Sequence, residues 1–250
     1  ILASKVDQVS QRAAHAVKAM EAGKFSTILD RERVVLWQLQ ESAARVAWLF
    51  PGQGSHYPET PSVFSASDSA RRILANVDEL YAASNLPKLS AAFDNAAIKP
   101  GSDVWWAQAW VLGVSAALIE TLKTAGLHPD AVLGHSFGEF TASLAANVTT
   151  LPQAIELAKH RANAVMSHMR VPGGLLSIRA AVHEVDSILK TAGLPVYVTH
   201  LNSTKQTVIA GSRDGIASAK LLLDKQAIAS MSVSVPAPFH TPLLADAEIA

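Results

Sequence analysis

The sequence of 250 residues contains no cysteine. A thiol nucleophile, a cysteine-ligated metal and a disulfide are therefore excluded. Neither sign of charge is in excess, because 21 lysines and arginines are matched by 21 aspartates and glutamates. No global field therefore favours nucleic acid or an acidic membrane surface, and an anionic substrate must be met by local charge.

Long apolar runs are also absent. No run reaches the about 18 residues of a membrane span, and no signal peptide is visible, so we expect a cytoplasmic protein without a membrane span. Apolar residues are nevertheless abundant, at 49% of the chain, which is enough for one or two packed cores. The chain begins at Ile1 rather than Met, and we expect it to be a piece of a longer protein.

The most informative segment is Gly134-His135-Ser136-Phe137-Gly138, which follows the apolar run 131–133. A strand, a turn too tight for flanking side chains and a helix over 139–146 are typical of a nucleophile elbow. The two glycines permit such a turn, and Ser136 then projects with backbone N–H groups near it. The alternative is an ordinary strand–loop–helix turn with a serine near a helix cap.

Apolar periodicity predicts the other elements. Helical spacing within residues 1–45 indicates a linker or docking segment. The following elements are then expected: a strand over 45–50, helices over 68–83, 105–125 and 152–169, strands over 175–178, 196–199, 207–210 and 230–235, and helices over 183–191 and 213–226. Taken in chain order from residue 175 onward, these strands and helices follow one another as β-α-β-β-α-β, which is typical of a ferredoxin-like arrangement.

The expected fold class is therefore α/β. We expect an α/β-hydrolase-like large subdomain formed by residues 46–170 and 236–250, with its C-terminal part missing. A ferredoxin-like small subdomain, residues 171–235, is inserted into it. Residues 1–45 precede both.

A serine hydroxyl is a poor nucleophile at neutral pH and needs a base. Among nine histidines, the best candidate is His240, which follows a strand in a loop stiffened by three prolines. Its alternative is a histidine in a surface turn. His135 adjoins Ser136, but neighbouring side chains point in different directions, so we expect it to line the site. The remaining histidines, His200 among them, are expected to be surface or satisfied core groups.

Three segments carry a resemblance to a known family: 50–55 (Phe-Pro-Gly-Gln-Gly-Ser), 134–139 (Gly-His-Ser-Phe-Gly-Glu) and Phe239-His240. They resemble the signatures of malonyl-CoA:acyl-carrier-protein transacylases. That family includes free-standing fatty-acid enzymes and the acyltransferase domains of polyketide and polyunsaturated-fatty-acid synthases. The resemblance runs from about residue 45 to the end and implies the same inserted ferredoxin-like subdomain.

The resemblance implies a role for each matching residue. Ser136 would accept the acyl group as an ester, with His240 as its base in a Ser-His dyad. The backbone N–H groups of Gln53 and Phe137 would form the oxyanion hole, so that Gln53 acts chiefly through its backbone. Arg161 would pair with the free carboxylate of a malonyl group, because a planar guanidinium matches a carboxylate. The alternative for Arg161 is an arginine on a helix surface.

Further positions match the family near its site: Gln108, His135 and Asn202. In the polyketide branch of the family, a phenylalanine before this histidine goes with malonyl and a serine with methylmalonyl, so the resemblance implies that Phe239 favours malonyl. A bulky ring can deny space to a branching methyl. Two departures leave the choice of extender unit open. Ala237-Pro238 stand where His-Ala is usual, and His56 stands where glutamine is usual.

The implied function is transfer of a malonyl group from coenzyme A, through an ester on Ser136, to the phosphopantetheine thiol of an acyl carrier protein. Coenzyme A and phosphopantetheine are then substrates, and no bound cofactor or metal is expected. Expected partners are the acyl carrier protein and neighbouring synthase domains such as a ketosynthase. The group that orients the base in the family lies beyond Ala250.

Two other functions stay open. A serine esterase or thioesterase with the same elbow would use an acid between the serine and the histidine, and three aspartates lie in that interval: Asp186, Asp214 and Asp224. A non-catalytic docking domain of a synthase is the other possibility.

Overall fold

The structure is a computed structural model that describes residues 6–23, 28–29, 34–35, 45–55, 64, 68–94, 101 and 103–247. The chain divides into two compact units, Ile1–Arg45 and Val46–Ala250. In the first unit, helix α1 (Val6–Glu21) precedes strands β1 (Ile28–Leu29) and β2 (Val34–Val35), which pair antiparallel.

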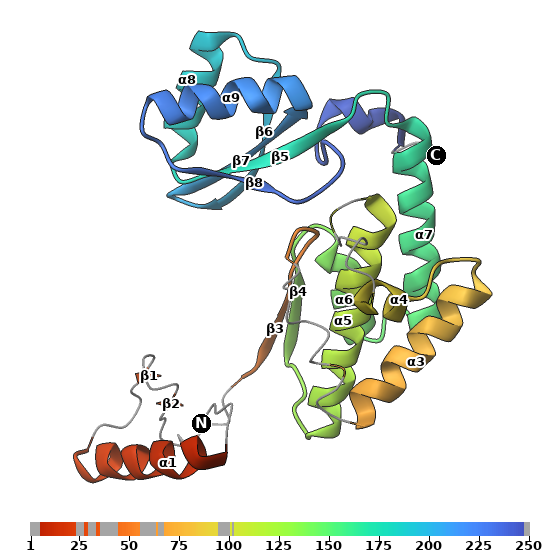
Figure 1. Ribbon diagram of the computed structural model, residues 1–250, viewed down its shortest axis with the longest axis vertical. Coiled ribbons are helices and arrows are strands. Elements are labelled where there is room, and N and C mark those ends of the chain that lie inside the picture. The colour runs from red at the N-terminus through yellow and green to blue at the C-terminus, as the bar shows by residue number, and fades with distance from the viewer. Residues whose placement is uncertain are drawn as a thin grey trace. The chain divides into compact units, whose positions relative to one another are not determined.

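The second unit begins with strand β3 (Ala47–Phe50), which pairs in parallel with β4 (Ala131–Gly134). Five helices accompany this pair: α3 (Asp68–Ala83), α4 (Leu89–Asp94), α5 (Val104–Thr124), α6 (Gly138–Ala145) and α7 (Leu151–His168). In Figure 1 these helices lie together beside the two strands. The segment 68–83 has the helical bounds that the periodicity predicts.

Helix α5 forms the centre of the larger hydrophobic core. It is apolar on nearly all sides, as the sequence predicts, and most of its side chains are buried. Tyr81 of α3 packs against Trp105 of α5 and donates a hydrogen bond to the carbonyl of Ala109 at 3.0 Å. Helix α7 packs on the same helix and begins with a capping box formed by Thr150 and Gln153. This packing fixes the side chains that α5 and α7 contribute to the site.

Residues 173–233 form a sheet covered by two helices. Its elements are β5 (Gly173–Ile178), α8 (Val182–Ala192), β6 (Val196–Ser203), β7 (Gln206–Ser212), α9 (Arg213–Lys225) and β8 (Ser230–Val233), followed by a 3₁₀ helix, η2 (Pro242–Ala247). All neighbouring strands are antiparallel, in the order β6-β7-β5-β8. One face, which includes Leu176, Ile178 and Ile209, packs on α8 and α9 in a second core. Figure 1 shows both helices on that face.

Several strand boundaries differ from the predicted ones. β3 begins at Ala47 instead of 45, and β6 extends to Ser203 instead of ending at 199. β5 begins at Gly173 instead of 175, because its glycine backbone packs closely in the sheet: a Cβ on Gly173 would lie 2.2 Å from the carbonyl oxygen of Gly211. β7 is longer than predicted at both ends. β8 ends at Val233 instead of 235, because the N–H of Val235 turns back to the carbonyl of Val233.

In the described part of the chain, no helix combines the length and the apolar character needed to cross a membrane.

Candidate active site

Ser136 lies in the turn between β4 and α6, with a φ of 53°. This left-handed conformation costs a non-glycine residue about 1–2 kcal/mol. The flanking glycines make the turn possible. A Cβ on Gly134 would lie 2.3 Å from the backbone N of Glu139, and one on Gly138 would lie 2.2 Å from the carbonyl oxygen of Phe50. The turn thus presents Ser136 at the amino end of α6, as the motif predicts.

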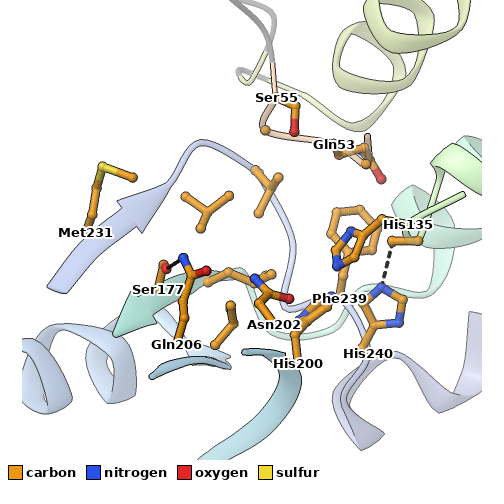
Figure 2. A pocket seen from close by; sticks show the side chains of 17 residues that line it. Gln53, Ser55, His135, Ser177, His200, Asn202, Gln206, Met231, Phe239 and His240 are labelled. Carbon is orange, nitrogen blue, oxygen red and sulfur yellow. Dashed lines mark hydrogen bonds between the residues drawn. The ribbon is translucent and has the colours of Figure 1, made fainter. Parts of the chain in front are cut away.

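His240 lies directly against Ser136, although 104 residues separate them in the chain. Its Nε2 is 2.8 Å from Ser136 Oγ, a hydrogen-bonding distance (Figure 2). His240 also has a positive φ, 62°. Its loop is fixed by the hydroxyl of Thr241, which donates to the carbonyl of Pro238 at 2.7 Å. Both members of the pair therefore sit in a conformation that only the surrounding structure can maintain.

Two backbone N–H groups beside the serine are free to bind an oxyanion. Those of Gln53 and Phe137 have no acceptor among the described residues. The loop that carries Gln53 lies against the elbow, because a Cβ on Gly52 would be 2.8 Å from the carbonyl oxygen of His135 and 3.4 Å from Ser136 Cβ. Only glycine permits this approach of one backbone to the other.

Arg161 extends from α7 toward the same loop. Its Nη1 donates to Oε1 of Gln53 at 2.9 Å and to Oε1 of Gln108 at 2.5 Å. Its guanidinium carbon lies 4.8 Å from the ring centroid of Phe239 and 5.7 Å from that of Phe137, within cation–π range. Burial lowers the pKa of Arg161 to about 10, which leaves the group charged at neutral pH.

A cavity of about 230 Å³ is bordered by Ser136, His240 and Gln53 (Figure 2). It is bordered by the elbow, the 52–55 loop and the sheet face opposite α8 and α9. The predicted residues that line it are Gln53, His135, Ser136, Asn202, Phe239 and His240. Among the described residues, none that lines the cavity is a carboxylate. The arrangement provides a nucleophile, a base, oxyanion donors and a nearby cation.

Residues 47–249 match the protein family described as "Acyl transferase domain". The chain belongs to this family. The match covers more than half of the chain and includes every residue of the site.

Relatives of this acyltransferase domain are free-standing enzymes and parts of large synthases. It is 28% identical over 210 residues to the malonyl CoA-acyl carrier protein transacylase of Bacillus subtilis, covering 80% of this chain and 64% of that protein. It is 26% identical over 205 residues to the hispidin synthase of Neonothopanus nambi, covering 79% of this chain and 12% of that protein. The chain therefore spans about a tenth of the length of such synthases.

Solved structures show the same mixed α/β fold. The acyl-carrier-protein S-malonyltransferase of Burkholderia pseudomallei superposes with a TM-score of 0.70 and 26% identity, covering 82% of this chain and 66% of that one.

Three predicted residues of the acyltransferase domain do not themselves line the cavity. Gln108 is fully buried on α5. Its side-chain N–H group donates to the carbonyl of Ala158 at 3.0 Å, and its side-chain oxygen accepts from Arg161. It does not line the cavity. Phe137 and Arg161 are likewise absent from the cavity lining. The side chain of Gln53 does more than the sequence predicts, since it accepts the hydrogen bond from Arg161.

His200 belongs to the site, and its expected place on the surface or in the core was wrong. Its ring stacks on that of His135 at 5.1 Å and meets that of His240 edge-on at 4.9 Å (Figure 2). Alternation along β6 from the core residue Val198 would direct His200 into the core. A register shift between these two residues turns His200 to the cavity instead. No sequence signal marks this bulge.

Two histidines of the site, His200 and His240, have lowered pKa values that favour the neutral ring. Burial, followed by the charges of His240 and His135, lowers the pKa of His200 to about 4. The pKa of His240 is also lowered, first by burial and then by the charges of Arg161 and His135, while Glu139 acts in the opposite direction. A neutral His240 is the form that can accept the proton of a serine.

The aspartates of the esterase alternative lie elsewhere. Asp186 pairs with Lys190 at 2.7 Å and Asp224 with Lys220 at 3.0 Å, while Asp214 lies in the first turn of α9. No group of the described residues hydrogen-bonds to Nδ1 of His240. His56 lies outside the described residues. A search of those residues finds no group of three or more side chains suited to hold a metal ion.

Proposed function

We propose that this acyltransferase domain moves a malonyl group from coenzyme A, through an ester on Ser136, to the phosphopantetheine thiol of an acyl carrier protein. One observation carries the proposal: Ser136 Oγ lies 2.8 Å from His240 Nε2, near the partly buried cation of Arg161. Family membership supports acyl transfer, and the Bacillus subtilis relative bears the name of this reaction.

The reaction has two symmetrical halves. Ser136 Oγ attacks the thioester carbonyl while its proton passes to Nε2 of His240. The oxyanion accepts hydrogen bonds from the N–H groups of Gln53 and Phe137, and losing one such donor typically lowers the rate about 10²–10³-fold. The C–S bond then breaks, and the coenzyme A thiolate takes the proton from His240. The carrier thiol reverses these steps and frees Ser136.

Arg161 would select a substrate with its own carboxylate. An arginine only donates, so the amide oxygens of Gln53 and Gln108 must face it. The Nε2 of Gln53 then points away from Arg161. It is buried and has no hydrogen-bond partner among the described residues. A malonyl carboxylate would accept bonds from the remaining guanidinium nitrogens and from this amide. Acetyl would leave all of these donors unpaired.

Phe239 would restrict the acyl group to malonyl. Its ring is 5% exposed, lines the cavity and packs against Arg161. A methyl branch on the malonyl carbon has to displace this fixed ring, although one methyl contributes only about 1–3 kcal/mol to such discrimination.

The organisation that we propose has an α/β-hydrolase-like large subdomain, residues 46–170 and 236–250, and an inserted ferredoxin-like small subdomain, residues 171–235. The antiparallel strand order β6-β7-β5-β8 supports the second part. Residues 1–45 would link the domain to a neighbouring synthase domain such as a ketosynthase. Coenzyme A and phosphopantetheine are substrates in this scheme, and no cofactor is bound.

Intact-mass spectrometry tests the proposal. Mixing the protein with malonyl-, methylmalonyl- and acetyl-CoA should add a malonyl group, and an added holo-carrier should remove it. The Ser136→Ala variant should stay unmodified. Rapid loss of the acyl group to water without a carrier would instead identify a hydrolase. A labelled acyl-enzyme that persists in Ser136→Ala would exclude this serine.

A further inference from the structure

A second cavity continues the one that contains Ser136. Its volume is about 450 Å³, and three residues border both cavities: Ser177, Gln206 and Met231. The side chain of Gln206 donates to Ser177 Oγ at 3.0 Å, which links β7 to β5 at this junction. In Figure 2 these residues lie at the end of the pocket away from His240. The two cavities therefore form one groove over the open face of the sheet.

The order of residues along the strands gives the groove its direction. On β5, Leu175 borders the first cavity, Ser177 borders both, and Arg179, just past the strand, borders the second. These alternate residues share a face, opposite Leu176 and Ile178, which pack on the helices.

The strands on either side of β5 show the same order. On β7, Val208 borders the first cavity, Gln206 borders both, and Lys205, in the adjoining turn, borders the second. On β8, Val233 borders the first cavity and Met231 borders both. The groove thus leads away from Ser136 along the strand axes.

The far end of the groove carries positive charge. Arg179 and Lys205 both border the second cavity and are exposed. Neither pairs with a carboxylate in the described part of the chain. Of the described residues that border the second cavity, none is acidic. An anion at this end would meet two cations and no repulsion.

The length of the groove matches a pantetheine arm. The four residue-to-residue steps from Leu175 on β5 to Arg179, just past the strand, span about 13 Å at 3.3–3.4 Å each. The about 13 bonds between the sulfur and the phosphorus of phosphopantetheine span about 15 Å, because three bonds of an extended chain reach about 3.5 Å. An arm whose sulfur lies at the Leu175 end of the groove, in the cavity that Ser136 also borders, thus reaches the charged end with its phosphate.

We propose that Arg179 and Lys205 bind the phosphate attached to pantetheine, while the arm lies over Ser177, Gln206 and Met231. This inference rests on the proposed function. The same phosphate is present in coenzyme A and in the prosthetic group of a carrier protein. Two cations at an exposed end suit a phosphate because they pair with it without burying charge.

The experiment compares substrates with and without the phosphate, in the full-length protein that contains this chain. One arm measures kcat/KM for loading from malonyl-CoA and from malonyl-pantetheine. The other measures transfer from the malonyl-enzyme to 4′-phosphopantetheine and to pantetheine. We expect Arg179→Ala with Lys205→Ala to lower the preference for the phosphorylated form about tenfold. Lys205→Glu should lower it further, and Lys225→Ala, on α9, should leave it unchanged.

The outcomes separate this inference from the proposed function. A lower preference in the loading arm supports the site for coenzyme A, and one in the transfer arm supports it for the carrier group. An unchanged preference in both arms overturns the inference but leaves acyl transfer intact. A protein that takes malonyl from neither donor contradicts the proposed function itself.

Discussion

Removing the guanidinium of Arg161 should abolish the preference for malonyl over acetyl. Nη1 is already used by the amide oxygens of Gln53 and Gln108. The other two nitrogens have no hydrogen-bond acceptor within the described part of the chain, so we expect them to be available to a carboxylate. Two charge-assisted bonds at the lower limit of about 1.5 kcal/mol each contribute about 3 kcal/mol. At about 1.4 kcal/mol per factor of ten, Arg161→Ala should reduce the selectivity ratio roughly 150-fold.

The assay is competition between malonyl-CoA and acetyl-CoA, read as the ratio of their kcat/KM values for acylation of Ser136. A matched control is Arg213→Ala, which removes an exposed arginine at the start of α9 and should leave the ratio unchanged. Gln108→Leu keeps Arg161 charged but removes one acceptor that orients it, so an intermediate loss is expected. If Arg161→Ala retained the wild-type ratio, the assignment of the carboxylate site would be refuted.

Three further predictions concern the elbow and the base. In urea unfolding, Ser136→Gly should be more stable than Ser136→Ala by about 1 kcal/mol. Both variants lack the hydroxyl, but only glycine relieves the strain of the positive φ. Equal stabilities would contradict this strain. Gly138→Ala should destabilise the fold by about 1–3 kcal/mol, since its Cβ meets the carbonyl of Phe50, whereas Gly174→Ala, with open space around it, should not. The rate of malonyl loading should begin to fall on acidification only below pH 6.5, because the pKa of His240 is lowered and the base stays neutral until the pH reaches that lowered pKa. A rate that already falls above pH 6.5 would contradict a neutral base.

The elbow and the order of the elements could be predicted because local rules determine them. Two glycines around Ser136 fix a turn between a strand and a helix, and alternation or helical spacing marks each later element. The base was predictable only in part: a proline-rich loop indicated that His240 is held rigidly, but its 2.8 Å approach to Ser136 depends on packing between segments 104 residues apart.

The remainder of the site depends on information that a single sequence does not carry. His200 faces the cavity because a bulge reverses the alternation of side-chain directions along β6. No residue type in the sequence predicts that bulge. The sequence predicted a role for the backbone of Gln53 alone. Nothing in its own segment indicates that α7 brings Nη1 of Arg161 within 2.9 Å of Oε1 of Gln53. The role proposed for Arg161 comes from the family resemblance, because helix periodicity alone does not distinguish it from a surface arginine.

The burial of Arg161 explains how a protein without net charge would select an anionic acyl group. Its guanidinium lies against the rings of Phe137 and Phe239, where folding has already removed water from it. A malonyl carboxylate would restore the lost interactions, whereas acetyl would not. Screening by salt acts mainly on exposed charges, and the Debye length falls from about 30 Å at 0.01 M to about 8 Å at 0.15 M. Over this range the malonyl-to-acetyl ratio should therefore stay constant while the preference for the phosphorylated substrate, which depends on exposed Arg179 and Lys205, declines. Parallel decline of both quantities would show that the carboxylate meets Arg161 in water, and would contradict selection by a buried cation.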